Sequence, residues 1–520
     1  MRIVSRKPFL FAFLWLFILP NSVPAQTRGQ VNEAKTARYF ATIQTDPLLL
    51  LPFLRKMPKG GDLHNHFGGG IYAESFIDWA VKSNLCIEMS TLSVFKPDEN
   101  KRPCVAKPAD MKPSDPSPAR RYAAEALKDP TLYNRLVDAW SMRNWQLSGQ
   151  SGHDHFFDTF GKSGAAGYGR SGEMLADVTN LAASEGVSYL ELMSTLDGSI
   201  SRNAGAAAGW NDDLAALRSN LLVHGVDQAV SASHIALDDG DRSFRTLNGC
   251  GTPGAKPGCS VRVRFIYQVL RAFSPAEVFA QMLTGFELAS ADPRVVGLNL
   301  VQPEDSFLSM QDFSLHMRML GFLRQQYPKV HLTLHAGELA AGLVRPEGLR
   351  FHIRESVEIA RADRIGHGVD VMHEDDPIEL LQKMAQRNTL VEICLTSNDV
   401  ILGVRGKEHP LRLYLKYGVP VALASDDLGV SRSDMTHEYL RAALDQGMNY
   451  LQLKMMARNS LSYSFIAGSN LWADVRKFVP VNQCLAGWDT PVCRSFLSIN
   501  EKAALQIELE KSFTAFERKY

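Results

Sequence analysis

Hydrophobic and polar residues alternate along this chain in blocks that predict repeated strand–helix units. Short apolar runs of strand length recur, and each is followed by a longer segment with helical periodicity. Eight such runs are present: a short one around Leu63 and others at 187–192, 261–270, 295–300, 330–334, 364–366, 390–395 and 420–424. Strands that alternate with helices form parallel sheets, because each helix returns the chain to the same edge.

Eight strand–helix units predict an α/β fold of the (β/α)₈ type, the TIM barrel. An open, doubly wound sheet is the competing architecture. The positions of the polar residues favour the barrel, because barrel enzymes build their sites at the carboxyl ends of the strands. Five polar residues stand at or just beyond those ends: His66, Glu191, His335, His367 and Asp426.

The chain has 520 residues, more than the ~250 of a plain barrel, so we expect additions to the barrel. We assign residues 1–25 to a signal peptide, 26–56 to a short helical segment, 57–470 to the barrel domain and 471–520 to a C-terminal helical extension. Insertions are expected after strands 1 and 2. The first, at about 85–120, contains a stretch rich in Pro, Lys and Asp.

The N-terminus has the pattern of an export signal. Basic residues within the first seven positions precede the apolar run 9–19, which is too short to cross a bilayer of ~30 Å as a helix. Small residues at Val23-Pro24-Ala25 then suit a signal peptidase. We therefore expect cleavage after Ala25 and an exported protein, periplasmic or secreted, without membrane attachment.

Cysteine usage agrees with export. Six of the seven cysteines fall into pairs that are close in sequence, namely Cys86 with Cys104, Cys250 with Cys259, and Cys484 with Cys493. Cys394 stands alone inside the apolar run 390–395. These positions predict three local disulfides and one buried free thiol. Reduced surface cysteines are the alternative, because connectivity does not follow from sequence.

The charge balance removes one class of function. Lys+Arg and Asp+Glu each number 56, so the formal net charge is +0. A nucleic-acid-binding domain normally carries a basic excess. We therefore expect a small-molecule substrate and no nucleic-acid partner.

Histidine and carboxylate residues at the predicted strand ends form a candidate metal site. His64 and His66 are two residues apart on a strand, so their side chains leave the same face and can share one ion. His335 ends the fifth predicted strand, and Asp426 follows the eighth. Three histidines and one aspartate suit Zn²⁺ and leave one position for water. Zinc lowers the pKa of such a water to about 7.

Further residues complete a candidate hydrolytic site. His367, in Gly366-His367-Gly368, can hold or accept the proton of the water, and the flanking glycines would let a substrate approach. Glu338, three residues after His335, can donate a proton if a closed pocket raises its pKa. Asp427 directly follows Asp426, so its side chain should point elsewhere, and we assign it to orienting the substrate.

Each motif is weak alone, but their combination and order resemble the adenosine deaminase family. The motifs are Met57-Pro58-Lys59 before His64-x-His66, His335-Ala336-Gly337-Glu338, Arg364-Ile365-Gly366-His367-Gly368 and Ser425-Asp426-Asp427. The resemblance runs over about 57–470. It implies a barrel enzyme with one Zn²⁺ per chain that hydrolyses adenosine, 2′-deoxyadenosine or a related purine nucleoside to inosine or its analogue and ammonia.

The resemblance also implies a role for each residue. The four predicted ligands match the zinc ligands of the family. Glu338 matches the acid that protonates purine N1, His367 the base that positions the water, and Asp427 the group that holds N7. Gln302 and Gly337 are the other expected substrate contacts.

The chain departs from the family pattern in the expected pocket. Gln302 stands where the family has a glycine, and Phe67-Gly68-Gly69 stands where cytosolic members carry an aspartate, so the nucleoside is left open. The export signal, the cysteine-bearing insertion and Ser397-Asn398 with His409-Pro410 resemble the secreted growth-factor branch of the family. Members of that branch dimerise, so a homodimer is one expectation.

Other assignments compete with this one. A second His-x-His motif, His153-Asp154-His155, precedes an aromatic helical stripe, which favours lid or core packing over metal binding. A cytidine-deaminase zinc site is excluded, because it requires P-C-x-x-C. Another barrel hydrolase that cleaves an amide or ester, and a secreted signalling protein that keeps the fold, stay open. The intact ligand set favours an enzyme.

Overall fold

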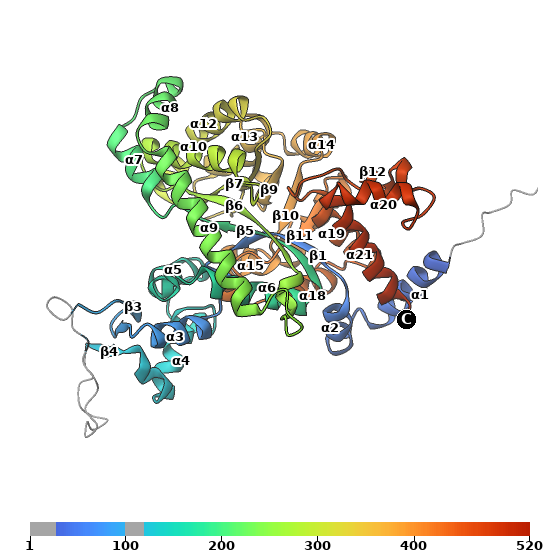
Figure 1. The fold of residues 1–520 in the computed structure, drawn as a ribbon, viewed down its shortest axis with the longest axis horizontal. Coiled ribbons are helices and arrows are strands. Elements are labelled where there is room, and N and C mark those ends of the chain that lie inside the picture. Colours follow the sequence, from blue (N-terminus) through green and yellow to red (C-terminus); the bar gives the residue numbers. More distant parts are fainter. Residues whose placement is uncertain (1–27, 99–103, 105–118) are drawn as a thin grey trace, which may run out of the picture.

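The computed structural model describes residues 28–98, 104 and 119–520, and a parallel eight-stranded sheet forms its centre (Figure 1). The strands are hydrogen-bonded in the order β1-β5-β6-β7-β8-β9-β10-β11. Their bounds are β1 Gly60–His66, β5 Val187–Ser194, β6 Arg262–Leu270, β7 Val295–Val301, β8 His331–Ala336, β9 Arg364–His367, β10 Leu390–Ile393 and β11 Val421–Leu423.

The first and last strands of this sheet join, which closes it into a barrel. Asn65 of β1 forms a parallel bridge with Asp426, just beyond β11. The amide of His66 donates to the Asp426 carbonyl (3.2 Å), and the amide of Asp426 donates to the His64 carbonyl (2.8 Å). The predicted TIM barrel is confirmed, and the open sheet is excluded.

One predicted strand boundary is wrong. The apolar run 390–395 was expected to be strand throughout, but β10 ends at Ile393. Cys394 precedes α15 (Leu395–Leu402), where the backbone turns into a helix. Apolar residues at the start of a buried helix and at the end of a buried strand look alike in sequence.

Helices cover the outside of the barrel because each buries an apolar face against the strands. In α10 (Pro275–Ala291), Ser274 and Glu277 form a capping box and Pro275 starts the helix. Phe279 and Phe286 of α10 are fully buried, each worth about 1.5–3 kcal/mol. The other outer helices are α6 Ser171–Ser184, α12 Phe313–Gln326, α13 His352–Glu358, α14 Pro377–Arg387, α16 Leu411–Lys416, α18 Met435–Leu444 and α19 Tyr450–Ser462.

Two long insertions interrupt the barrel, after its first and second strands. The first carries a small antiparallel sheet in the order β3-β2-β4. Its elements are α3 Ala73–Lys82, β2 Cys86–Glu88, β3 Ser93–Phe95, β4 Arg120–Tyr122, α4 Pro130–Ala139 and α5 Gly152–Gly167. The second contains α7 Ile200–Ala208, α8 Leu214–Val223 and α9 Val226–Asn248. Shorter helices are α11 Phe307–Gln311 and α17 Leu428–Ser431.

The two terminal segments pack together on the other side of the barrel from the small sheet (Figure 1). The N-terminal segment forms α1 (Arg28–Ile43) and α2 (Pro47–Lys56), and Thr36 donates to the Glu517 carbonyl. The C-terminal segment contains β12 Trp472–Asp474, β13 Val479–Pro480, α20 Pro491–Ser498 and α21 Glu501–Glu517. The β12–β13 pair was not predicted, since that segment was expected to be helical.

All three predicted disulfides are present. Cys86 is bonded to Cys104, Cys250 to Cys259 and Cys484 to Cys493, while Cys394 is free and buried. The predicted signal peptide, 1–25, lies outside the described residues. Within the described part of the chain, no helix has the length and apolar character needed to cross a membrane.

Candidate active site

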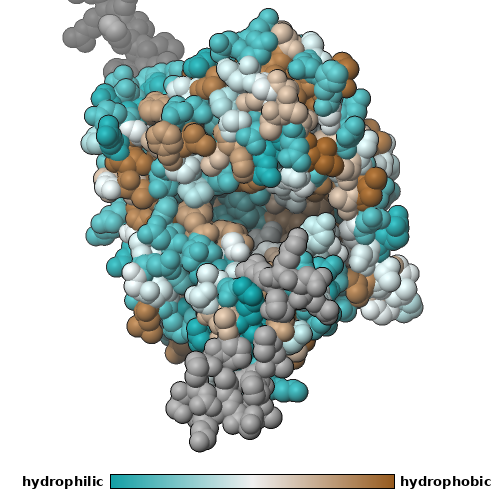
Figure 2. Space-filling view, turned by 90° about the vertical axis from the view of Figure 1, so that its left-hand side faces the viewer, coloured by the Kyte–Doolittle hydropathy of each residue, from teal (hydrophilic) through white to brown (hydrophobic). Residues whose placement is uncertain are grey.

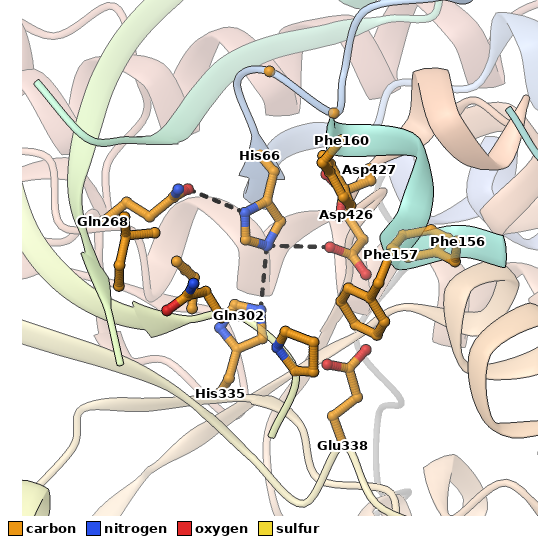
Figure 3. Close-up of a pocket in the computed structure, with 15 residues that line it drawn as sticks. His66, Phe156, Phe157, Phe160, Gln268, Gln302, His335, Glu338, Asp426 and Asp427 are labelled. Atoms are coloured by element: carbon orange, nitrogen blue, oxygen red, sulfur yellow. Dashed lines mark hydrogen bonds and ion pairs between the residues drawn. The ribbon is translucent and has the colours of Figure 1, made fainter. Parts of the chain in front are cut away.

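A pocket of about 440 Å³ opens at the carboxyl ends of the barrel strands (Figure 3). The space-filling view shows the surface hollowed between hydrophilic and hydrophobic side chains (Figure 2). The polar residues of the pocket lie at or just beyond strand ends, and the apolar ones come from α5, the ends of β6 and β7 and the loop after β7. The polar set is His66, Gln268, Gln302, His335, Glu338, Asp426 and Asp427, and the apolar set is Phe156, Phe157, Phe160, Leu270, Val301 and Pro303.

The four predicted metal ligands converge below this pocket. Nε2 of His66 lies 3.3 Å from Oδ1 of Asp426 and 3.2 Å from Nε2 of His335 (Figure 3). Nε2 of His64 lies 3.6 Å from the same Asp426 oxygen. His367 belongs to the same cluster, because one ligand atom each of His64, His335, His367 and Asp426 lie within 4.8 Å of one another.

Hydrogen bonds on the far side of the rings show that this cluster fits a cation. Oδ1 of Asn299 accepts the backbone amide of His335 (3.0 Å), so Nδ1 of His335, 2.8 Å away, must donate to the same oxygen. Nδ1 of His66 faces Oε1 of Gln268 at 3.3 Å. Both Nε2 atoms therefore carry lone pairs that face each other, and His64 Nε2 has no hydrogen-bond partner. A positive ion between them removes this repulsion.

Burial sets the protonation of the ligand histidines. It lowers the pKa of His66 to about 4 and that of His335 well below the ordinary value, so both rings are neutral, as metal ligation requires. Burial also acts to lower the pKa of His64, but the Asp426 carboxylate 3.6 Å from Nε2 and the Glu392 carboxylate bonded to Nδ1 outweigh it and raise the pKa to about 10. Two carboxylates around His64 thus demand positive charge at this point.

Glu338 is held beside the cluster in a form that can donate a proton. The amides of Gly337 and Glu338 donate to the two oxygens of Glu304 (3.0 and 2.8 Å), which fixes the turn after β8. Burial, with the charges of Asp426 and Glu304, raises the pKa of Glu338 well above its ordinary range. This environment favours the protonated carboxyl, the form that can donate a proton.

His367 lies between Glu338 and the cluster. Nδ1 accepts from the amide of Asn398 at 2.9 Å and lies 3.7 Å from Glu338 Oε1, which leaves Nε2 toward the cluster. Burial lowers the pKa of His367 to about 3. Gly366, the residue before it, leaves space for the His64 ring, because a Cβ at position 366 would lie 2.6 Å from that ring. The predicted role of that glycine in admitting substrate is wrong.

Asp427 lines the pocket beside Asp426, because one carboxylate oxygen of each residue and one ring nitrogen of His66 lie within 4.8 Å of one another. The prediction that its side chain points elsewhere than that of Asp426 is wrong. Oδ1 of Asp427 is buried and has no partner, and burial with the charge of Asp426 raises its pKa well above the ordinary value. A side chain at position 69 would overlap this carboxyl, since a Cβ on Gly69 would lie 1.5 Å from Asp427 Oδ1. The glycine turn after β1 therefore makes room for Asp427.

The structure separates the two remaining expected substrate contacts. Gln302 lines the pocket with a backbone φ of 82°, its carbonyl accepts from Arg271, and its Oε1 accepts from the Ala272 amide (2.8 Å). Gly337 is not among the residues that line the pocket, and its amide donates to Glu304. Gln302 can therefore contact a substrate with its amide NH₂, whereas the Gly337 amide is already occupied.

Aromatic residues of α5 form the outer wall. Phe156 lies 5.3 Å from Phe157 and 5.7 Å from Phe160 between ring centroids. The second His-x-His motif stands on the same helix, where His153 pairs with Asp305 at 3.0 Å. Neither His153 nor His155 joins a possible metal group in the part of the chain that is described.

Sequence reasoning missed the residues that orient the ligands. Oε2 of Glu392 lies 2.7 Å from His64 Nδ1, and its Oε1 accepts from Thr333 and Arg364. Asn299 does the same for His335. The available signal was a polar residue inside an apolar run, in Leu390-Val391-Glu392-Ile393 and in Leu298-Asn299-Leu300.

Comparisons with known proteins agree with this geometry. A family model described as adenosine deaminase matches residues 177–472, which include all the predicted site residues except His64 and His66. The adenosine deaminase of Salmonella typhi is 32% identical over 220 residues, and that of Escherichia coli (strain SMS-3-5 / SECEC) is 33% identical over 218. These matches cover 42% and 41% of this chain and 60% of each relative.

A solved structure shows the same fold. The ADAL–IMP complex is 16% identical, with a TM-score of 0.51, and the match covers 90% of this chain and 100% of that one. The family model covers more than half of the chain, including His335, His367 and Asp426. This chain therefore belongs to the adenosine deaminase family.

Proposed function

We propose that this protein is a zinc-dependent aminohydrolase that converts adenosine, 2′-deoxyadenosine or a related purine nucleoside to the 6-oxo product and ammonia. The observation that carries the proposal is that one pocket holds both a histidine and aspartate cluster that fits a cation and the buried Glu338, whose pKa is raised. His64, His66, His335 and Asp426 would hold the metal. When bound, zinc would make a water molecule acidic enough to supply hydroxide near neutral pH.

The residues of the chain supply the proton transfers. Glu338 donates its proton to N1 of the purine, which makes C6 electrophilic. His367 holds the water by donating Nε2–H to its oxygen, because Nδ1 accepts from Asn398. As that oxygen adds to C6, one proton of the water passes to the leaving amino group and the other restores the carboxyl of Glu338, and ammonia departs. The balance is one nucleoside and one water consumed, and one 6-oxo nucleoside and one ammonia formed.

Asp427 and Gln302 orient the base. A protonated Asp427 can donate to N7, which is an acceptor, and its raised pKa favours that form. The Gln302 amide can donate to a ring nitrogen, because its oxygen is already bonded to Ala272. The aromatic wall then packs against the outer side of the bound nucleoside.

Ultraviolet absorbance tests the proposal directly. Zinc-loaded protein is incubated with adenosine, 2′-deoxyadenosine or adenine, and loss of the absorbance of the 6-amino purine is followed with ammonia release. We expect turnover of at least one nucleoside, with one ammonia per product. Absence of turnover with all three would remove the deaminase proposal and leave an amide or ester hydrolase as the alternative.

We also infer that the protein acts outside the cytoplasm. Three disulfides support this, because such bonds persist in oxidising compartments. Cleavage after Ala25, a homodimer and closeness to the growth-factor branch stay predictions. N-terminal sequencing of the exported protein and its mass in solution test the first two.

A further inference from the structure

A second cavity, of about 430 Å³, lies at the opposite end of the barrel, where β8, β9 and β10 begin. Phe465 closes its inner side, stacked on His331 with 4.4 Å between the ring centroids. Four of the charged side chains in its wall are basic, namely Arg361, Arg364, Arg387 and Lys502, and one is a carboxylate, Asp363.

Some of these charges are already balanced. Asp363 accepts two hydrogen bonds from Arg324, at 2.8 and 3.1 Å. Arg364 lies between the buried carboxylates Glu191 and Glu392. Neither residue therefore contributes free charge to the cavity.

Three cations remain. Arg361, Arg387 and Lys502 form no ion pair with any described residue, and Arg387 reaches only the Val357 carbonyl, at 2.6 Å. Arg361 and Arg387 are exposed and Lys502 is half-buried, so water screens part of their mutual repulsion, and an anion bound among them would offset the rest. The negative carboxyl end of α13 offsets the charge of Arg387, but it does not offset the charges of Arg361 and Lys502.

Lys502 is the most informative of the three. It stands in the first turn of α21, where the positive end of the helix disfavours a cation and favours an anion. Burial lowers the pKa of Lys502 to about 8, while the charge of Glu191 acts to raise it and that of Arg364 to lower it. Lys502 is half-buried, lines the cavity and forms no ion pair with a described residue.

We propose that this cavity binds a multiply charged oxyanion, with a phosphate group as the best fit, held by Arg361, Arg387 and Lys502. Two guanidinium groups can each offer paired N–H donors to a tetrahedral oxyanion, and the ammonium adds a third contact. The site is independent of the proposed deamination, since it lies at the other end of the barrel.

Calorimetry and thermal unfolding test the site with inorganic phosphate as the probe. We expect saturable binding at a stoichiometry of one, and an unfolding temperature that rises with phosphate at constant ionic strength. Lys502→Met should weaken phosphate binding by at least about tenfold, the value of one charge-assisted hydrogen bond. Lys511→Met, on the exposed face of the same helix, is the matched control and should bind phosphate like the parent.

Parallel titrations with glycerol phosphate, sulfate and succinate identify the source of the anion. Binding of both phosphate compounds supports a site for a phosphate group, free or esterified. Equal binding by the parent and Lys502→Met would overturn the proposal, since it would place phosphate elsewhere, for example at the metal cluster. Shifts that follow ionic strength alone, equal for chloride, would overturn it as well.

Discussion

Two His-x-His pairs in this molecule have the same spacing, but only one of them brings its two rings to a common site. His64 and His66 lie on β1, where residues two apart project from the same face, and both rings reach Asp426. His153 and His155 lie on α5, where residues two apart are separated by about 200° around the axis. His153 turns to Asp305, while His155 bonds the carbonyls of buried backbone.

The difference shows that a metal-ligand pair is recognised by ring nitrogens that have no hydrogen-bond partner within the protein. The rings of α5 find acceptors for their nitrogens within the protein. On β1, Nδ1 of each ring is bonded and Nε2 of His64 is left without a partner. A cation would give the unpartnered nitrogen on β1 a partner, whereas the nitrogens on α5 already have theirs. Each of the following predictions tests one part of this contrast.

The largest effect is expected from His66→Ala. Removal of this ring takes away one nitrogen ligand and leaves His335 Nε2 without its neighbour, so zinc should be lost on dialysis against a chelator and turnover should vanish. Metal analysis and activity are measured together. Retention of one zinc per chain in this variant would contradict the assignment of His66 as a required ligand.

Glu338→Gln separates metal binding from proton transfer. The amide preserves the shape of the side chain but cannot supply a proton to N1, so kcat should fall about 10²-fold or more while zinc content stays at one per chain. The raised pKa of Glu338 also fixes the sign of the pH profile of the parent. Activity should fall as pH rises through that pKa, because the protonated form is the active one. Near-parent kcat in the variant would refute the role of Glu338.

Glu392→Gln tests whether orientation of the His64 ring matters. The substitution removes the charge opposite His64 Nδ1, and outer partners of this kind typically contribute 10–100-fold in metal affinity. We expect zinc affinity to fall within that range in a competition titration. Glu438→Gln is the matched control, since Glu438 is equally buried and bonds the Thr396 amide instead. Equal losses in both variants would point to general destabilisation.

The sequence sufficed for the barrel and for the ligands on the strands because both follow short-range rules. An apolar run marks a strand, and a period of two marks a face. Glu392 was not identified because its partner His64 is 328 positions away, and only the register of eight strands brings them together. Gly366 was misassigned for the same reason, since the ring that fills its space comes from another strand.

The basic cavity was beyond sequence reasoning for a related physical reason. Three barrel strands, β9 to β11, and the start of the C-terminal segment lie between Arg361 and Lys502 in the sequence, and each residue alone resembles an ordinary surface cation. They indicate an anion site only because no carboxylate of the described residues pairs with them. Such an absence can be established only once the packing of the described residues is known.

The smallest effect is expected from His153→Ala, which tests the other side of the contrast. The hydrogen bond to Asp305 raises the pKa of His153 to about 9. A group with a raised pKa in the folded state stabilises that state below its unfolded pKa, about 6.5, and the contribution is lost as pH rises through about 9. The variant should therefore be less stable by below about 1 kcal/mol, discounted for solvent screening, near neutral pH and as stable as the parent above about pH 10.

Urea unfolding of both proteins at about pH 6 and about pH 10 measures this difference, with zinc content determined in parallel. Zinc should remain at one per chain, because the α5 pair contributes no ligand. A loss of zinc in His153→Ala would mean that α5 takes part in the metal site when it closes over the pocket. A stability difference that persists at high pH would mean that His153 acts through packing against Phe157, whose ring lies 4.9 Å away, and not through its charge.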